Sequence, residues 1–151
     1  MDSLNETAYC GLYCQDCMHY KNNFSIHAQR LVDELKKIEF REYAEINSGF
    51  KANLEKFGIF SDVLNTLAGI KCNKTCRVGG GCSGIPCQIM KCCLSKGYTG
   101  CWECYDIDPC DKFDILTPVC GKNPKNNLRL IKKHGVENWV DLRNKFYIWQ
   151  K

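Results

Sequence analysis

Thirteen cysteines constrain this sequence more than any other feature, because they all lie in two stretches, residues 10–17 and 72–120. In a secreted protein such a density indicates a disulfide framework. Complete internal pairing cannot satisfy an odd count, however. The opening "MDSLNETAYCGLYC" also lacks the basic region, apolar stretch and cleavage site of a signal peptide. We therefore expect a reducing, cytoplasmic environment, no membrane segment, and cysteines that bind metal rather than form disulfides.

The first cysteine stretch, "AYCGLYCQDCMHY", has the spacing C-x3-C-x2-C from Cys10 through Cys14 to Cys17. Radical-SAM enzymes bind an iron–sulfur cluster with this spacing, and their chemistry resides in a complete or partial barrel. A complete barrel of the TIM type needs roughly 200 to 250 residues. The chain has 151 residues and no repeating strand–helix pattern, which argues against such an enzyme. Cys14-x2-Cys17 instead predicts a tight turn that directs two sulfurs at one zinc ion.

The second stretch contains another C-x2-C pair, Cys101-Trp-Glu-Cys104. A thioredoxin-type dithiol has the same spacing, but it requires a βαβ pattern that this sequence lacks. The neighbouring cysteines favour metal, since four thiolates complete a tetrahedral zinc site. The candidate metal ligands of the whole chain are Cys10, Cys14, Cys17, Cys72, Cys76, Cys82, Cys87, Cys92, Cys101, Cys104 and Cys110.

The sequence leaves the grouping of these ligands open. One grouping forms two sites from the second stretch alone, namely Cys72, Cys76, Cys82 and Cys87, and Cys92, Cys101, Cys104 and Cys110. The N-terminal cysteines then need a fourth ligand, and the candidates are His19, Cys93 and Cys120. The alternative closes Cys14 and Cys17 with a later pair, which would staple the N-terminus to the centre of the chain. We expect about two or three zinc ions in total.

The segment between the two cysteine stretches is predicted to be a helical insert over residues 24–69. Apolar residues at helical spacing predict one helix from about residue 25 to 46. Residues 50–57 indicate a short helix, and a third helix is expected to begin at Ser61 and to end at Gly69.

Further helices are predicted in the second half of the chain. The stretch "IPCQIMKCCLSKG" is typical of a helix with Pro86 and Cys87 in its first turn and Gly97 just past its end. A short helix is expected to begin near Pro109.

In the tail, Asn123 is expected to cap a helix that ends at Gly135. A last helix would place four apolar residues on one face, which are Trp139, Leu142, Phe146 and Trp149.

No stretch shows the alternation of a strand, so the predicted fold class is mainly α. We expect a single small helical domain over residues 1–151, with irregular cysteine-rich loops organised around zinc-knuckle-like metal sites. Its parts would be a cysteine knuckle at 8–20, the helical insert, a cysteine-rich metal segment at 72–120 and a helical tail at 123–149.

Several motifs in order resemble the small cysteine-rich family called domain of unknown function 3795. They are "AYCGLYCQDCMHY", a C-x4-C pair leading into a "KG" helix end, "CWECYDIDPC" and "LRLIKKHGVENWV". The resemblance covers nearly the whole chain, with the helical insert as its least distinctive part. It implies a small cytoplasmic protein of a bacterium or archaeon with metal-binding cysteines, and it implies no known activity.

The leading functional hypothesis is a metal-binding protein with structural zinc sites and no evident catalytic site. One alternative is an iron–sulfur or thiol redox protein, although the bacterial ferredoxin run of cysteines is absent. Another is a nucleic-acid or protein adaptor that uses the basic C-terminal helix, since residues 120–151 carry 8 basic and 2 acidic side chains. The net charge of +4 supports the adaptor only weakly, because two tetrathiolate zinc sites would bring it to about zero.

Overall fold

The computed structural model of the chain describes residues 3–81 and 87–150, and these form a mainly helical protein. Two predicted features, the candidate ligand Cys82 and the helix-start proline Pro86, lie outside the described residues. The chain divides into two compact units, Met1–Tyr20 with Cys72–Lys151, and Lys21–Lys71. The expected helical insert lies within the second of these units.

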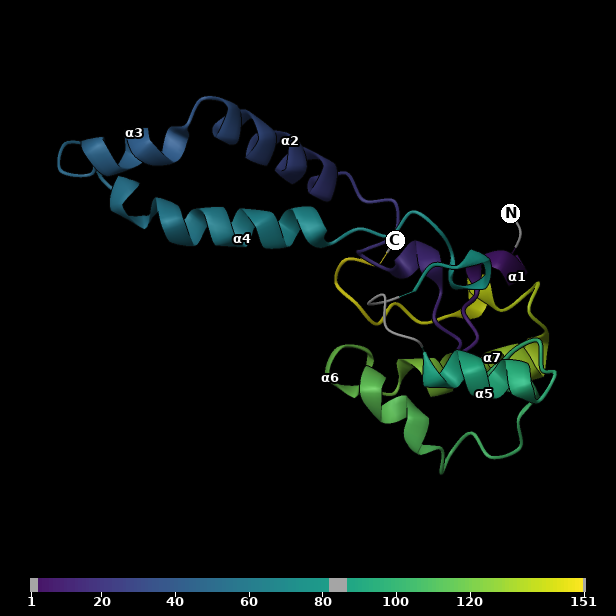
Figure 1. Cartoon of the computed structure of the whole chain (residues 1–151). Coiled ribbons are helices and arrows are strands. Elements are labelled where there is room, and N and C mark those ends of the chain that lie inside the picture. Colours follow the sequence, from purple (N-terminus) through teal and green to yellow (C-terminus); the bar gives the residue numbers. More distant parts are fainter. Residues whose placement is uncertain (1–2, 82–86, 151) are drawn as a thin grey trace. The chain divides into compact units, whose positions relative to one another are not determined.

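The Lys21–Lys71 unit is built from the helices α2 (Phe24–Lys37), α3 (Phe40–Asn47) and α4 (Phe57–Gly69), with a 3₁₀ turn, η2 (Leu54–Lys56), before α4. The helices α2 and α4 pack along each other (Figure 1). Apolar side chains at helical spacing meet between them because each helix turns one apolar stripe inward. The residues buried there are Ala28, Val32, Leu64 and Ala68.

Two helix predictions in this unit are wrong. The single helix expected over 25–46 is broken at Glu39, which adopts a left-handed conformation with φ of 52°. The break is stabilised by a tertiary contact, since Phe40 begins α3 and its ring centroid lies 5.0 Å from that of Phe57. The helix α4 begins at Phe57 rather than Ser61, because the preceding 3₁₀ turn leads directly into it.

The other unit carries all the described cysteines on short helices, turns and loops. Among its described residues the only strand-like pairings are two isolated bridges, Thr7 with Tyr13 and Tyr20 with Cys72. Its elements are α1 (Ser3–Glu6), η1 (Cys14–Asp16), η3 (Cys76–Val78), α5 (Gln88–Ser95), η4 (Cys101–Glu103), η5 (Asp111–Leu116), α6 (Thr117–Cys120), α7 (Asn123–His134) and η6 (Val140–Leu142). The predictions that glycines follow α5 and end α7 are confirmed, since Gly97 and Gly135 have φ of 67° and 82°.

The core of this unit is centred on Trp139, which is fully buried. Its indole Nε1 donates to Thr7 Oγ1 at 3.2 Å, and its ring meets that of Tyr13 edge-on at 5.8 Å. The inner face of α7 adds Leu128 and Ile131. The N-terminal residues and the tail therefore share one core.

The expected last helix is wrong, and so is the predicted cap of α7. After Trp139 the chain makes only the short turn η6, and Arg143 is already extended. Polar contacts with Asp16 hold the tail in this form, so Phe146 is half-exposed instead of facing the core. Asn123 is the first residue of α7, and Lys122 is its cap.

No helix among the described residues is long and apolar enough to cross a membrane.

Candidate metal centres

The two C-x2-C pairs form the same tight turn, as their spacing predicts. In the first pair the backbone N–H of Cys17 donates to the carbonyl of Cys14 at 3.0 Å. In the second pair the N–H of Cys104 donates to the carbonyl of Cys101, also at 3.0 Å. Both pairs begin in a 3₁₀ turn and leave it in an extended conformation. Each turn thus brings two thiols to one side of the chain, as a zinc knuckle requires.

The first turn is joined to the start of the second cysteine stretch by a backbone contact. The N–H of Cys72 donates to the carbonyl of His19 at 2.7 Å, next to the bridge between Tyr20 and Cys72. This contact gathers four thiols, which we call the first thiol cluster: Cys14, Cys17, Cys72 and Cys76. This arrangement corresponds to the alternative grouping from the sequence, in which Cys14 and Cys17 lie with a later pair of cysteines.

Backbone N–H groups point at three sulfurs of the first thiol cluster. The N–H of Cys76 donates to the Cys14 sulfur, and those of His19 and Tyr20 donate to the Cys17 sulfur. The Cys76 sulfur accepts from the N–H of Tyr9. Burial raises the pKa of Cys14 to about 11 and raises the pKa values of Cys17 and Cys76, and these hydrogen bonds oppose it. The donors favour the thiolate, which is the form that binds metal.

Two further thiols lie beside the first thiol cluster. Cys87 is close enough to Cys76, and Cys120 to Cys17, for a thiolate at either to raise the pKa of its neighbour. Cys87 was expected in the first helical turn, but this is wrong: it is the extended cap residue that precedes α5. Cys10 is buried in the hydrophobic core.

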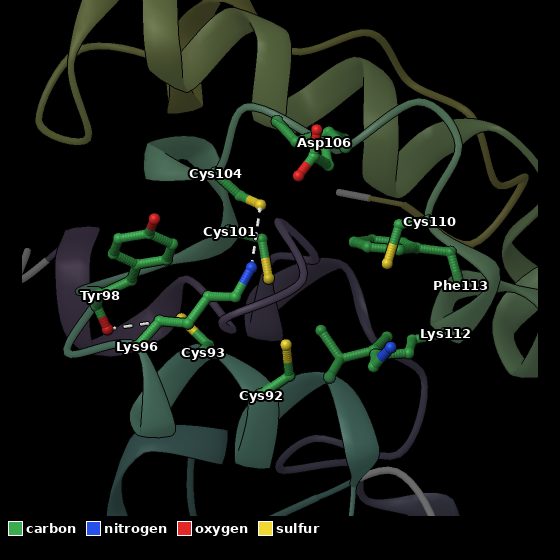
Figure 2. Close-up of a pocket in the computed structure, with 12 residues that line it drawn as sticks. Cys92, Cys93, Lys96, Tyr98, Cys101, Cys104, Asp106, Cys110, Lys112 and Phe113 are labelled. Atoms are coloured by element: carbon green, nitrogen blue, oxygen red, sulfur yellow. Dashed lines mark hydrogen bonds between the residues drawn. The ribbon is translucent and has the colours of Figure 1, made fainter.

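The remaining thiols among the described residues line a pocket between α5, η4 and η5 (Figure 2). We call them the second thiol cluster, and its members are Cys92, Cys93, Cys101, Cys104 and Cys110. Figure 2 shows the sulfurs of four of them pointing into the same space, those of Cys92, Cys101, Cys104 and Cys110. These four are the ones that sequence reasoning grouped around one ion.

Cys93 is the fifth thiol of this pocket and is almost fully buried. Its sulfur donates to the carbonyl of Tyr98 at 3.3 Å and accepts a hydrogen bond from Cys101. Burial raises the pKa of the Cys101 thiol well above its usual range, and the neighbouring Cys93 raises it further. Without metal, Cys101 is therefore held as the protonated thiol, and an ion bound there would have to displace its proton.

A lysine faces the second thiol cluster from the solvent side. Lys96 Nζ donates to the Cys104 sulfur at 4.0 Å. The Cys104 and Cys92 thiolates raise the pKa of Lys96, because they favour its charged form. An ammonium at this place offsets the negative charge that accumulates when several thiolates gather.

Neither cluster is arranged as a finished coordination sphere. Among residues 3–81 and 87–150, no three His, Cys, Asp or Glu side chains are placed so that they could hold a metal ion as they stand. The thiols are near neighbours, and a bound ion would have to draw them together. The grouping that includes Cys82 lies partly outside the described residues.

Sequence reasoning missed the residues that position the clusters. Arg77 Nε donates to the carbonyls of Leu4 and Thr7 at 2.6 and 2.8 Å, which ties η3 to the N-terminal segment. Gly80 packs so closely on Lys74 that an added Cβ would lie 1.9 Å from the Lys74 carbonyl oxygen. The glycine run "GGG" was the only sequence signal for the close packing of Gly80. Nothing in the charge pattern indicates that Arg77 donates to backbone carbonyls of the N-terminal segment.

The fold and the two thiol clusters define a small, mainly helical, cysteine-rich protein. The chain belongs to the DUF3795 family, described as proteins of unknown function, whose sequence model matches residues 6–115. The resemblance noted in the sequence is thereby confirmed over these residues, whereas the motif "LRLIKKHGVENWV" lies beyond the match. The matched part spans both thiol clusters and ends before α7. Neither a curated protein nor a solved structure matches the chain.

Proposed function

We propose that this protein is a cytoplasmic zinc-binding protein with two structural sites. The first thiol cluster would hold one ion through Cys14, Cys17, Cys72 and Cys76. The second would hold another through Cys92, Cys101, Cys104 and Cys110. The observation that carries the proposal is the set of backbone N–H donors directed at the Cys14, Cys17 and Cys76 sulfurs. Such donors stabilise thiolates, which Zn²⁺ requires as ligands.

Zinc at the first thiol cluster would join two segments that are far apart in the sequence. Cys17 and Cys72 flank the Lys21–Lys71 unit in sequence, so one ion would hold both ends of that unit's chain together. Structural zinc supplies roughly 10 kcal/mol or more of folding free energy in small domains. That contribution would matter here, because the surrounding segments are short turns and loops that bury little apolar surface of their own.

Zinc at the second thiol cluster is supported by the charges around it. A tetrathiolate zinc site carries a net charge of about −2, which is costly to bury without a compensating cation. Lys96 contacts the Cys104 sulfur. Lys112, which pairs with Asp111 at 3.5 Å, and Asp106 also line the pocket. The Lys96 ammonium would offset part of the charge of a dianionic site at this partly open position.

The test is metal analysis of the full-length untagged protein purified without oxygen. We expect about two zinc ions per chain and loss of helical circular dichroism when a strong chelator removes them. Cys14→Ser and Cys104→Ser should each lose one ion, and Cys10→Ala should keep both, because Cys10 lies in the core. A metal-free protein that is fully folded would contradict the proposal. Visible absorption with acid-labile sulfide would favour the iron–sulfur alternative.

A further inference from the structure

The basic residues of α7 face the loop that carries one candidate ligand of the second thiol cluster. This loop, residues 105–110, runs from the C-x2-C turn to Cys110, and its side chains at Tyr105 and Asp108 are exposed. Ile107 is its one buried side chain, and the half-buried Cys110 packs against the same core. A loop with so little buried surface needs other contacts to hold its backbone in one conformation.

Lys125 provides such contacts to the loop backbone. Its Nζ donates to the carbonyl of Asp108 at 2.8 Å and to that of Cys110 at 3.4 Å. The same ammonium lies 5.4 Å from the centre of the Phe113 ring, in η5 just beyond Cys110. One side chain therefore fixes the carbonyls on both sides of Pro109 and the turn that follows.

Two more cations on the same face of α7 contact the same loop. Arg129 forms an ion pair and hydrogen bond with Asp108. Lys132 places its Nζ 5.1 Å from the centre of the Tyr105 ring. Residues 125, 129 and 132 share one helix face because they are spaced by four and three residues. These side chains are engaged within the chain, which argues against their use as a free basic patch for nucleic acid.

The inner face of α7 also reaches the second C-x2-C turn. Leu128 and Ile131 are buried in the core cluster that includes Trp102, the residue after Cys101, and α7 packs against η4. The helix thus holds both the Cys101–Cys104 turn and the loop that leads to Cys110. The helix α7 itself lies beyond residues 6–115, which the family model matches.

We propose that α7 is a supporting element of the second metal site and that Lys125 is the positioning residue that holds Cys110 ready to bind. The proposal rests on the proposed function, since it assumes that the second thiol cluster binds metal. Residues that orient ligands typically contribute 10- to 100-fold to metal affinity. We expect the lower end of that range, about tenfold, because Lys125 acts through backbone carbonyls.

The experiment uses the full-length protein loaded with ¹¹³Cd²⁺, whose NMR resonances report each thiolate site separately. Cys14→Ser and Cys110→Ser assign the resonances of the first and second sites. Lys125→Met keeps the aliphatic stem and removes the donors, Lys125→Arg restores them, and Lys133→Met is the matched control on α7. Chelator competition with Cd²⁺ then gives the affinity of each site in every variant.

We expect Lys125→Met to shift the second-site resonance and weaken that site about tenfold, with the first site unchanged. Lys125→Arg and Lys133→Met should resemble the parent protein. Equal affinities in Lys125→Met and the parent would overturn the proposal, and so would an equal loss at both sites, which indicates a general defect. Failure of the parent protein to bind any Cd²⁺ would instead contradict the proposed function itself.

Discussion

Asp16, inside the first C-x2-C turn, forms a bidentate ion pair with Arg143 near the end of the chain. Arg143 Nε donates to Oδ2 at 2.7 Å and Nη2 donates to Oδ1 at 2.8 Å. Gln150 Nε2 adds a third hydrogen bond, to Asp16 Oδ2, at 2.9 Å. The Asp16 side chain is only 6% exposed and that of Arg143 15%. The turn that presents Cys14 and Cys17 is therefore anchored by the C-terminal tail.

Asp16→Asn should destabilise the zinc-loaded protein by about 2–3 kcal/mol, because it leaves the Arg143 charge without its partner. This expected loss of stability is smaller than the loss on breaking a fully buried ion pair, since Arg143 keeps some contact with solvent. Urea unfolding followed by circular dichroism measures the change. Glu137→Gln, at an exposed position, is the control and should stay within about 0.5 kcal/mol of the parent. A similarly small effect for Asp16→Asn would show that the ion pair does not anchor the turn.

Zinc binding at the first thiol cluster should release protons and weaken as the pH falls. Burial raises the pKa of Cys14 to about 11 and raises the pKa values of Cys17 and Cys76. These thiols are therefore protonated at neutral pH without metal, and Zn²⁺ must displace about three protons from them. The affinity for zinc should therefore rise with pH until the pH exceeds the raised pKa values of these thiols.

Calorimetry at pH 7 in buffers of different ionisation enthalpy gives the number of protons released. A release below about one proton per ion at this cluster would mean that the thiolates already exist without metal. Cys104→Ser, which removes a proposed ligand of the second site, is the variant used to measure the first cluster separately.

Lys96→Gln should lower the zinc affinity of the second site about two- to fivefold at low salt, because it removes a cation from the Cys104 sulfur. The effect should nearly vanish in about 1 M salt, since the ammonium is exposed and easily screened. Lys91→Gln, at an exposed position on α5, is the matched control. Chelator competition at two salt concentrations provides the measurement. A loss that is independent of salt would point to a packing defect rather than charge compensation.

The sequence predicted local features well and long-range ones poorly, for physical reasons. The two C-x2-C turns and the glycines after α5 and α7 depend on a few adjacent residues, so their geometry is encoded locally. The break at Glu39 depends on Phe40 meeting Phe57, and the extended tail depends on Arg143 reaching Asp16. Such contacts leave no periodic trace in a single sequence, and they override intrinsic helix propensity.

In the candidate metal sites, too, local features were predictable from the sequence and long-range contacts were not. Spacing predicted the candidate ligands and grouped Cys92, Cys101, Cys104 and Cys110, which line one pocket (Figure 2). Which later cysteines lie beside the first C-x2-C pair could not be predicted, because their proximity depends on the backbone contact between His19 and Cys72, which are far apart in the sequence. The role of Lys125 could not be predicted either, since its contacts with backbone carbonyls depend on where α7 packs.

The last prediction concerns the glycine run after Cys76. A Cβ on Gly80 would lie 1.9 Å from the Lys74 carbonyl oxygen and 2.7 Å from that of Thr75, and Gly80 N–H donates to the Thr75 carbonyl at 2.8 Å. Backbone cannot yield as a flexible side chain would, so Gly80→Ala must displace the 74–76 segment. We expect it to weaken zinc binding at the first site about tenfold, because Cys76 moves with that segment.

The neighbouring Gly81→Ala is a matched control, because an added Cβ there has no described atom within 4 Å. It should bind both ions as the parent protein does, whereas Gly80→Ala should lose affinity only at the site that includes Cys76. The ¹¹³Cd NMR assignments described above separate the two sites. If Gly80→Ala and Gly81→Ala proved equally harmless, the close approach of Gly80 to Lys74 would not position Cys76, and the first site would draw its geometry from the Cys14–Cys17 turn and the contact between His19 and Cys72 alone.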